Sequence, residues 1–293
     1  MEYLIHLAIL VSIYAMLGIS LNLVVGYTGL LSITQAAFYG LGAYTTAILL
    51  TKYDVSFFLS IGLGALITAV VSLLIGYVLS KFKGDYYALG SFGFNVIVYS
   101  IFLNSQGLTR GPLGIPGIDR PTFNFTNFIT FNFSSNLSFL VLVAIFATLI
   151  FFVSKFITES SFGRVLKAIR EDEQAIQIFG YKTHQYKLAI FVIGAAIASI
   201  AGAFFASYIT FIDPSTFTIN ESIFILSIII LGGLANLRGS VLGALFLILL
   251  PEILRFVGFP SDIAAQMRVL VYGALLVILM LYRPQGLLGE YKL

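Results

Sequence analysis

The sequence has 293 residues and a formal net charge of +3; 59% of its residues are hydrophobic and only 10% are charged. A soluble globular domain is about 25% charged, so this chain lacks the polar residues to cover a core, and a water-soluble fold is excluded. The sequence contains no cysteine, which also excludes disulfides, thiolate catalysis and thiol-based metal sites.

Apolar residues form nine blocks that suit a membrane crossing, since about 20 helical residues cross roughly 30 Å of hydrocarbon. In chain order the blocks are 3–25, 29–50, 57–80, 85–103, 137–157, 187–212, 222–236, 239–257 and 267–283. Lipid cannot hydrogen-bond to exposed backbone groups, and the alternating pattern of a barrel strand is absent, so the blocks predict helices. We expect an all-α fold, a polytopic transmembrane helical bundle of eight to ten spans forming a single domain over residues 1–293.

Two blocks depart from a regular span. The 29–50 block is interrupted by Gly29, Gly40 and Gly42, and the 222–236 block is short for a crossing. Either pattern is typical of a broken or re-entrant helix. The N-terminal block has no Lys or Arg before its apolar run and is longer than the apolar region of a signal peptide, which predicts a retained span.

The distribution of basic residues predicts the orientation, because basic loops stay on the cytoplasmic side of a membrane. With nine spans and the N-terminus outside, eleven of the sixteen Lys and Arg residues fall on the inner side and five on the outer side. Two long loops then face opposite ways. The outer one, about 104–136, is rich in glycine and proline turns, and the inner one spans 158–187.

The inner loop has an amphipathic pattern. Apolar residues such as Phe162, Leu166 and Ile169 recur at helical spacing, and Gly180 stands where a C-cap glycine belongs. The segment is either a connector lying on the membrane surface or a helix that docks another protein. Acidic residues at 171–173 disfavour an anionic lipid surface and favour a cytoplasmic protein partner.

The spans offer little chemistry. The two histidines, His6 and His184, stand alone, and no Ser/His/Asp set, metal-spaced cluster or carboxylate pair lies within the spans. We therefore expect no enzyme activity, metal, cofactor or nucleic-acid partner, and membrane lipid as the surroundings. Ion coupling usually leaves ionisable groups inside spans; Glu252 is the main deeper candidate, and a pair with Arg255 at helical spacing is the favoured interpretation.

Small residues indicate tight helix packing. Gly194, Ala198, Gly202 and Ala206 form one column at four-residue spacing, which lets backbones approach closely. Packing within the chain is favoured over a subunit interface. No P-loop motif occurs in the sequence, so an ATP motor for transport would be a separate protein docked at the inner loop.

Seven stretches of the sequence stand out in chain order: LNLVVGYTG at 21–29, LSITQAAFYGLGAY at 31–44, GDYYA at 84–88, TRGPLGIPG at 109–117, GRVLKAIREDE at 163–173 with Gly180, LGGL at 231–234 with Gly239, and RPQGL at 283–287. Together they resemble the permease subunits of branched-chain amino acid ABC transporters, in particular their LivM-like branch. The resemblance implies a permease subunit of an ATP-driven importer for branched-chain, hydrophobic amino acids, working by alternating access. It also implies the cytoplasmic (inner) membrane of a prokaryote.

The partners implied are two cytoplasmic P-loop ATPases, a second related permease and an extracytoplasmic substrate-binding protein. The residues expected to couple to the ATPases are Arg170, Glu171, Asp172, Glu173, Ala175 and Gly180. The sequence departs from the family at Gln174, Ile176 and Gln177, where alanine is more usual. The expected docking loop for the binding protein contains Arg110, Gly111, Pro112, Gly114 and Pro116.

An amino acid zwitterion would be accommodated by helix ends, glycines and uncharged polar groups. The candidate pathway residues are Asn22, Gln35, Tyr86, Gly232 and Gly233. Three alternatives stay open: a permease for urea or short amides, a passive channel, or a sodium-coupled carrier. The sequence also leaves open whether the permease pairs with itself or with a related chain.

Overall fold

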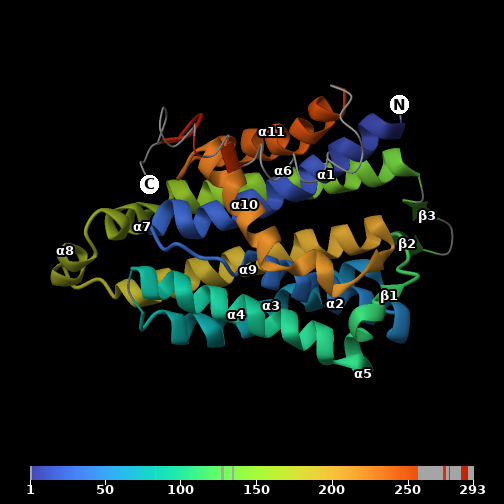
Figure 1. Ribbon diagram of the computed structural model, residues 1–293, viewed down its shortest axis with the longest axis horizontal. Coiled ribbons are helices and arrows are strands. Elements are labelled where there is room, and N and C mark those ends of the chain that lie inside the picture. The colour runs from blue at the N-terminus through green and yellow to red at the C-terminus, as the bar shows by residue number, and fades with distance from the viewer. Residues whose placement is uncertain are drawn as a thin grey trace.

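The computed structural model describes residues 2–82, 84–126, 129–133, 135–256, 273–274, 277 and 285–289 (Figure 1). The helices are α1 Glu2–Leu21, α2 Gln35–Tyr53, α3 Phe57–Leu79, α4 Asp85–Asn104, α5 Gln106–Thr109, α6 Asn136–Glu159, α7 Ser161–Glu171, α8 Glu173–Ile178, α9 Thr183–Ile209, α10 Ile219–Gly232 and α11 Leu237–Phe256. A π-helical turn, η1, continues α1 over Asn22–Gly26, and short 3-10 turns form η2 Gly111–Leu113 and η3 Pro214–Phe217. The strands are β1 Ile115–Pro116, β2 Thr122–Thr126, β3 Ile129–Asn132 and β4 Phe211–Ile212.

The all-α membrane bundle predicted from the sequence is confirmed. Each of the first eight apolar blocks corresponds to a helix, whereas most of the block at 267–283 lies outside the described residues. Among the described residues, five helices are long and apolar enough to cross a membrane: α1 with η1, α3, α4, α6 and α9. The number rises to six if α10 and α11, which meet at a bend of 119°, are counted as one broken span.

The two irregular blocks are irregular in the structure. Residues 29–34 are not helical, and α2 begins only at Gln35. The short 222–236 block ends in the sharp bend between α10 and α11. Of the three glycines in the 29–50 block, Gly29 lies in the break, whereas Gly40 and Gly42 lie inside the continuous helix α2 and are buried there, so they do not interrupt it.

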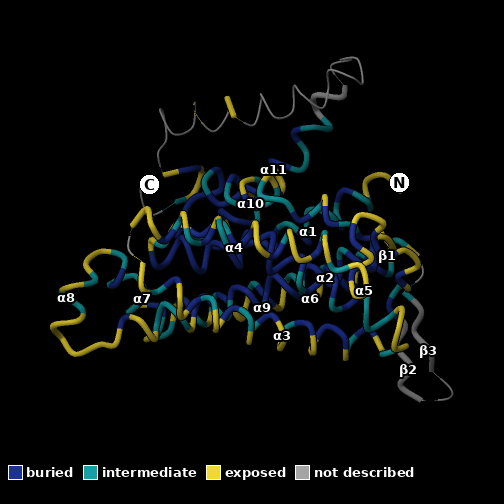
Figure 2. Tube along the Cα trace, turned by 60° about the horizontal axis from the view of Figure 1, so that its bottom comes forward, coloured by how far each residue is buried: buried dark blue, intermediate teal, exposed yellow. Residues whose placement is uncertain are grey.

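The core is built around α9, which packs against α1, α2 and α3 (Figures 1 and 2). The column Gly194, Ala198, Gly202 and Ala206 is buried in this packing. A Cβ atom at Gly202 would lie 2.1 Å from the Tyr39 carbonyl oxygen, so only glycine lets α2 and α9 come this close. The predicted role of the small residues in packing within the chain is therefore confirmed.

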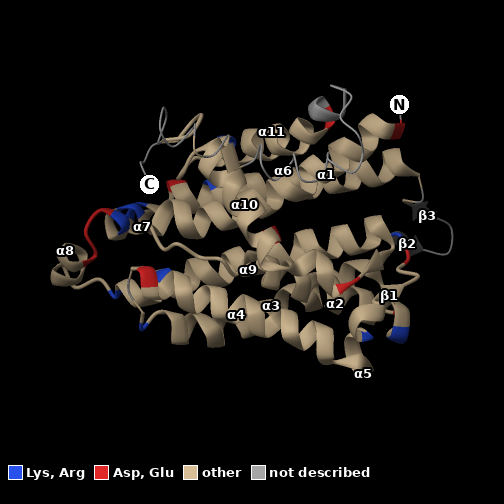
Figure 3. Cartoon of the chain, viewed as in Figure 1, with Lys and Arg blue, Asp and Glu red and all other residues tan. Residues whose placement is uncertain are grey.

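The two long loops lie at opposite ends of the bundle. One end carries the N-terminus, α5 and the strands, where β1 pairs with β4 and β2 with β3. The other end carries α7 and α8 (Figure 1). Figure 3 shows that most charged residues lie toward these ends and that the middle of the bundle is largely uncharged. This arrangement is that of a protein whose two ends face water.

Two carboxylates contact tyrosines. The Tyr3 hydroxyl donates to the Glu252 carboxylate, and the Tyr14 hydroxyl donates to Glu221 Oε1 at 2.7 Å. The predicted pair between Glu252 and Arg255 involves a side chain outside the described residues. In the described part of the chain, no group of three or more His, Asp or Glu residues is arranged to hold a metal ion.

Candidate functional site

The break between α10 and α11 is held by Asn22. This side chain is fully buried on the π-helical turn at the end of α1. Its Nδ2 lies 2.7 Å from Ser240 Oγ and 3.0 Å from the Asn236 carbonyl, and its Oδ1 accepts from the Ala235 backbone N–H at 2.9 Å. Backbone groups freed by a helix break must be satisfied by protein inside a membrane. Asn22 performs that task here.

Gly232 and Gly233 lie at the same break. A Cβ atom at Gly232 would lie 2.0 Å from the Gly239 carbonyl oxygen, and Gly233 has a φ of +114°, which L side chains rarely adopt. The Leu288 N–H also donates to the Gly232 carbonyl at 3.0 Å. The structure thus brings together three of the predicted pathway residues, Asn22, Gly232 and Gly233, and gives each of them a clear packing or bonding role.

A second polar cluster lies where α2 and α10 begin. Gln35 Nε2 donates to Ser20 Oγ, while Ser222 Oγ accepts from the Ala36 N–H at 2.9 Å and from Asn95 Nδ2 at 2.6 Å. The side chains of Gln35, Ser20, Ser222 and Asn95 are all buried. The cluster therefore places uncharged polar groups and the positive end of the α2 dipole inside an apolar bundle. At the start of α10 the carboxylate of Glu221 stands beside Ser222.

Hydrogen bonds to side chains of α4 hold the non-helical residues 29–34 in place. Asn95 Nδ2 donates to the Ile33 carbonyl at 2.8 Å, and the Ile33 N–H donates to Ser91 Oγ at 2.9 Å. The sequence analysis selected Gln35 but missed Asn95, Ser91 and Ser222. The available signal was Asn95 itself, a strongly polar residue in the middle of an apolar block, where such residues usually have a partner.

Tyr86 lies apart from both clusters. Its side chain is 72% exposed near the start of α4, whereas the neighbouring Tyr87 is buried. The structure therefore does not bring Tyr86 together with the other predicted pathway residues.

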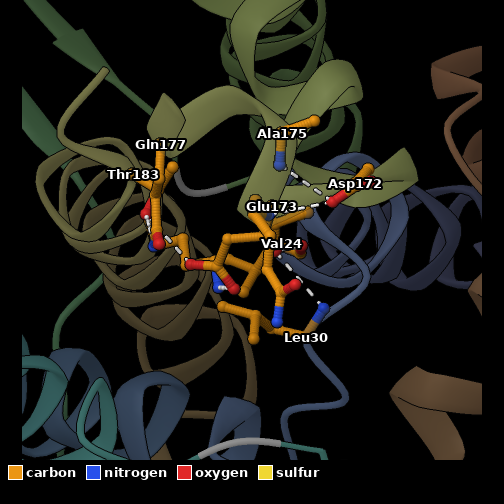
Figure 4. A network of polar contacts seen from close by, with 10 residues as sticks. Val24, Leu30, Asp172, Glu173, Ala175, Gln177 and Thr183 are labelled. Carbon is orange, nitrogen blue, oxygen red and sulfur yellow. Dashed lines mark hydrogen bonds and ion pairs between the residues drawn. The ribbon is translucent and has the colours of Figure 1, made fainter. Parts of the chain in front are cut away.

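The predicted inner loop folds into two helices, α7 and α8, that meet at Asp172 (Figure 4). The Asp172 carboxylate caps α8 by accepting from the backbone N–H groups of Gln174 at 2.9 Å and Ala175 at 3.0 Å. Such a side-chain cap stabilises a helix start by about 1 kcal/mol. The acidic stretch Glu171 to Glu173 therefore marks the boundary between the two helices.

Both helices are tied to the bundle. Arg170 donates to the carbonyl of Gly26, the last residue of η1. Glu173 pairs with Lys187 of α9 at 2.5 Å and also accepts from Thr183 Oγ1 at 3.0 Å. The junction between α7 and α8 is thus connected to both η1 and α9.

The predicted C-cap at Gly180 is confirmed. Gly180 has a φ of +86°, its N–H donates to the Gln177 carbonyl at 3.0 Å, and the Tyr181 N–H donates to the Ile176 carbonyl at 3.3 Å. These two bonds are those of a Schellman motif.

The tip of α8 is apolar and faces outward. Ile178 is 86% exposed and Phe179 is 77% exposed, and every residue of α8, including Ala175, is at least partly exposed (Figure 2). Two such side chains next to each other at a protruding end are typical of a surface that packs against a partner.

The residues of the predicted outer docking loop lie together at the other end. Gly111 and Gly114 are buried, while Arg110, Pro112 and Pro116 are exposed. Arg110 and Gly114 have positive φ angles of 60° and 67°, and a Cβ atom at Gly114 would lie 2.4 Å from the Ile212 carbonyl oxygen. The loop is thus a tight turn held against β4 that presents two prolines and an arginine.

Comparison with known proteins gives consistent matches over nearly the whole chain. The family model described as branched-chain amino acid transport system / permease component matches residues 3–280. The high-affinity branched-chain amino acid transport system permease protein LivM of Escherichia coli is 35% identical over 302 residues, which cover 97% of this chain and 69% of LivM. Permease protein BraD of Pseudomonas aeruginosa is 24% identical over 95% of this chain and 92% of its own length.

Another relative is LivH of Escherichia coli, a permease protein of a high-affinity branched-chain amino acid transport system, which is 25% identical over 95% of this chain and 92% of LivH. No solved structure matches the chain. The family model covers most of the chain, and the identity to LivM extends over almost all of it. The chain therefore belongs to the family of permease components of branched-chain amino acid transport systems.

Proposed function

We propose that the chain is the LivM-like permease subunit of an ATP-driven importer for branched-chain amino acids, in the cytoplasmic membrane of a prokaryote. The observation that carries this proposal is α8: a short capped helix with an exposed apolar tip, on a chain that is 35% identical to LivM. The chain has no P-loop motif, so the ATPase must be separate. Of the two expected cytoplasmic ATPase subunits, one would dock at α8 of this chain.

The bonds of the inner loop support a coupling role for Arg170, Glu171, Asp172, Glu173, Ala175 and Gly180. Arg170 joins α7 to the Gly26 carbonyl, and four residues earlier Asn22 holds the α10–α11 break. A displacement of α8 would therefore pass through Arg170 of α7 to Gly26, and from there along the η1 turn to Asn22 and the α10–α11 break. The pair between Glu173 and Lys187 transmits the same displacement to α9.

The two polar clusters support a pathway through the bundle. The amino acid carboxylate would be attracted to the start of α2, near Gln35, where the helix dipole is positive and no acidic residue stands in the first turn. Asn22, Gly232 and Gly233 would form the part of the pathway that changes when α8 moves. Tyr86 would contribute only from a surface covered by another subunit, since it is exposed on α4.

The remaining partners follow the same proposal. A second related permease would pair with this chain, and LivH is the kind of chain expected there. An extracytoplasmic binding protein would contact the turn formed by Arg110, Gly111, Pro112, Gly114 and Pro116. Alternating access would then be powered by ATP binding and hydrolysis on the partner subunits.

The test is purification of the tagged chain from its native membrane in mild detergent, with mass spectrometry of the proteins recovered with it. The complex is then reconstituted in liposomes, and uptake of labelled leucine is measured with and without ATP. We expect P-loop ATPases in the complex and ATP-dependent uptake that isoleucine and valine inhibit. Inhibition by urea or acetamide alone would refute the substrate assignment. Leucine uptake by the isolated chain without ATP would refute the importer class.

A further inference from the structure

Two adjoining cavities lie on the face formed by α1, α6 and α11. The larger, of about 630 Å³, is apolar and is lined by residues that include Ala15, Ala147 and Leu242. The smaller, of about 320 Å³, lies between the end of α6, α7 and the start of α11. Phe151 and Arg238 line both cavities, so the two form one continuous groove.

The smaller cavity is cationic. Among the described residues, its lining includes Lys155, Lys167 and Arg238 and one carboxylate, Glu159, which gives three positive charges against one negative charge. Glu159 lies 3.7 Å from Lys155, and the Lys167 Nζ lies 5.7 Å from the centre of the Tyr27 ring. Three cations from α6, α7 and α11 therefore converge on a cavity whose neighbour is apolar.

We infer that this groove binds one phospholipid with an anionic headgroup. The phosphate would lie among Lys155, Lys167 and Arg238, and an acyl chain would follow the apolar cavity between α1, α6 and α11. Charge complementarity favours this occupant, because the negative head of an anionic lipid matches the cationic cavity and its apolar tail matches the adjoining apolar cavity. The cationic cavity lies at the end that carries α7, which is the inner leaflet in the proposed orientation.

The expected size of the effect follows from the cations. A Lys or Arg near a membrane surface strengthens the binding of anionic lipid by about 1 kcal/mol, or roughly fivefold per residue. Removing two of the three cations should therefore weaken retention of an anionic lipid about 25-fold. The same change should leave retention of a zwitterionic lipid with the same acyl chains nearly unaltered.

The experiment is native mass spectrometry of the full chain, purified in detergent within its complex and titrated with phosphatidylglycerol or phosphatidylcholine of identical chains. We expect preferential retention of one phosphatidylglycerol, an about 25-fold loss in the double variant K155Q/R238Q, and no loss in K81Q/K182Q. The control variant removes two cations at the same end of the bundle but outside the groove. A147F, which fills the apolar cavity, should also reduce retention.

Several outcomes would overturn the inference. Equal retention of the two lipids by the wild-type chain would show an unspecific apolar surface, and this measurement needs no variant that might misfold. Full displacement by inorganic phosphate, with A147F retaining lipid normally, would show a plain anion site. An equal loss in K81Q/K182Q would show a general charge effect. Lipid binding is measured without ATP or uptake, so its failure is separate from a failure of the proposed transport function.

Discussion

Replacing Asn22 by alanine should destabilise the fold, because this side chain holds the α10–α11 break. Its Oδ1 accepts from the Ala235 N–H at 2.9 Å, and its Nδ2 lies 2.7 Å from Ser240 Oγ, all in a buried site. A buried donor left without an acceptor costs about 1–3 kcal/mol. Ser240 Oγ would keep its long contact of 3.5 Å to the Asn236 carbonyl, whereas the Ala235 N–H would lose its acceptor and the Gly233 carbonyl would lose its Asn22 donor at 3.3 Å.

We therefore expect N22A to lower the free energy of unfolding by about 1–3 kcal/mol. Hydrogen bonds between membrane helices average only about 0.6 kcal/mol in double-mutant cycles, so a value at the lower end of this range is favoured. The assay is reversible unfolding of the purified chain in mixed micelles with increasing SDS. The matched control is N104A, since Asn104 is exposed and its bond among the described residues is within its own helix, to the Ser100 carbonyl at 2.8 Å. The reasoning is refuted if N22A and N104A unfold at the same SDS concentration as the wild type.

Three further predictions concern coupling and packing. R170A should abolish ATP-dependent uptake while leaving the complex assembled and hydrolysing ATP. R164A should keep uptake, because within the described residues Arg164 bonds to Glu159 and Ser161, near the start of its own helix; equal loss in both variants would contradict the coupling route. G180V should destabilise the folded inner loop by about 1–2 kcal/mol, because valine would have to adopt the φ of +86° that Gly180 has. It should abolish uptake without removing the protein from the membrane, and uptake at the normal rate would disprove the role of the cap. G202V should prevent stable folding, because its Cβ would lie 2.1 Å from a backbone oxygen of α2. The shared control is G62V, since a Cβ at Gly62 meets no atom of the described chain within 4 Å, and normal detergent extraction of G202V would show that the close approach is dispensable.

Much of the fold could be predicted because apolar block length and small-residue spacing are direct consequences of a lipid solvent. The eight helices that match the first eight apolar blocks, the packing role of Gly202 and the C-cap at Gly180 all follow from local patterns. The division of the inner loop at Asp172 was not predicted, since its acidic residues fitted a single amphipathic segment equally well.

The candidate site was predicted only in part. Asn22, Gly232 and Gly233 were selected for their polarity or small size, and they meet because a chain break needs such residues. Asn95 and Ser222 were missed because their importance comes from a contact over 127 positions of sequence. Tyr86 was selected from a motif, but its side chain points away from the bundle while Tyr87 is buried. One residue of shift along a helix is enough to reverse such an assignment.

The bonds at the two helix breaks have a consequence for amide hydrogen exchange. The N–H groups of Ile33, Ala36 and Ala235 donate to the side chains of Ser91, Ser222 and Asn22, because Ile33 and Ala235 lie outside the helices and Ala36 lies in the first turn of α2, where no carbonyl of the same helix is available. A side-chain rotation releases such an N–H without unwinding any turn of helix. These three amide hydrogens should therefore exchange independently of one another, while the amides of the surrounding long helices stay protected.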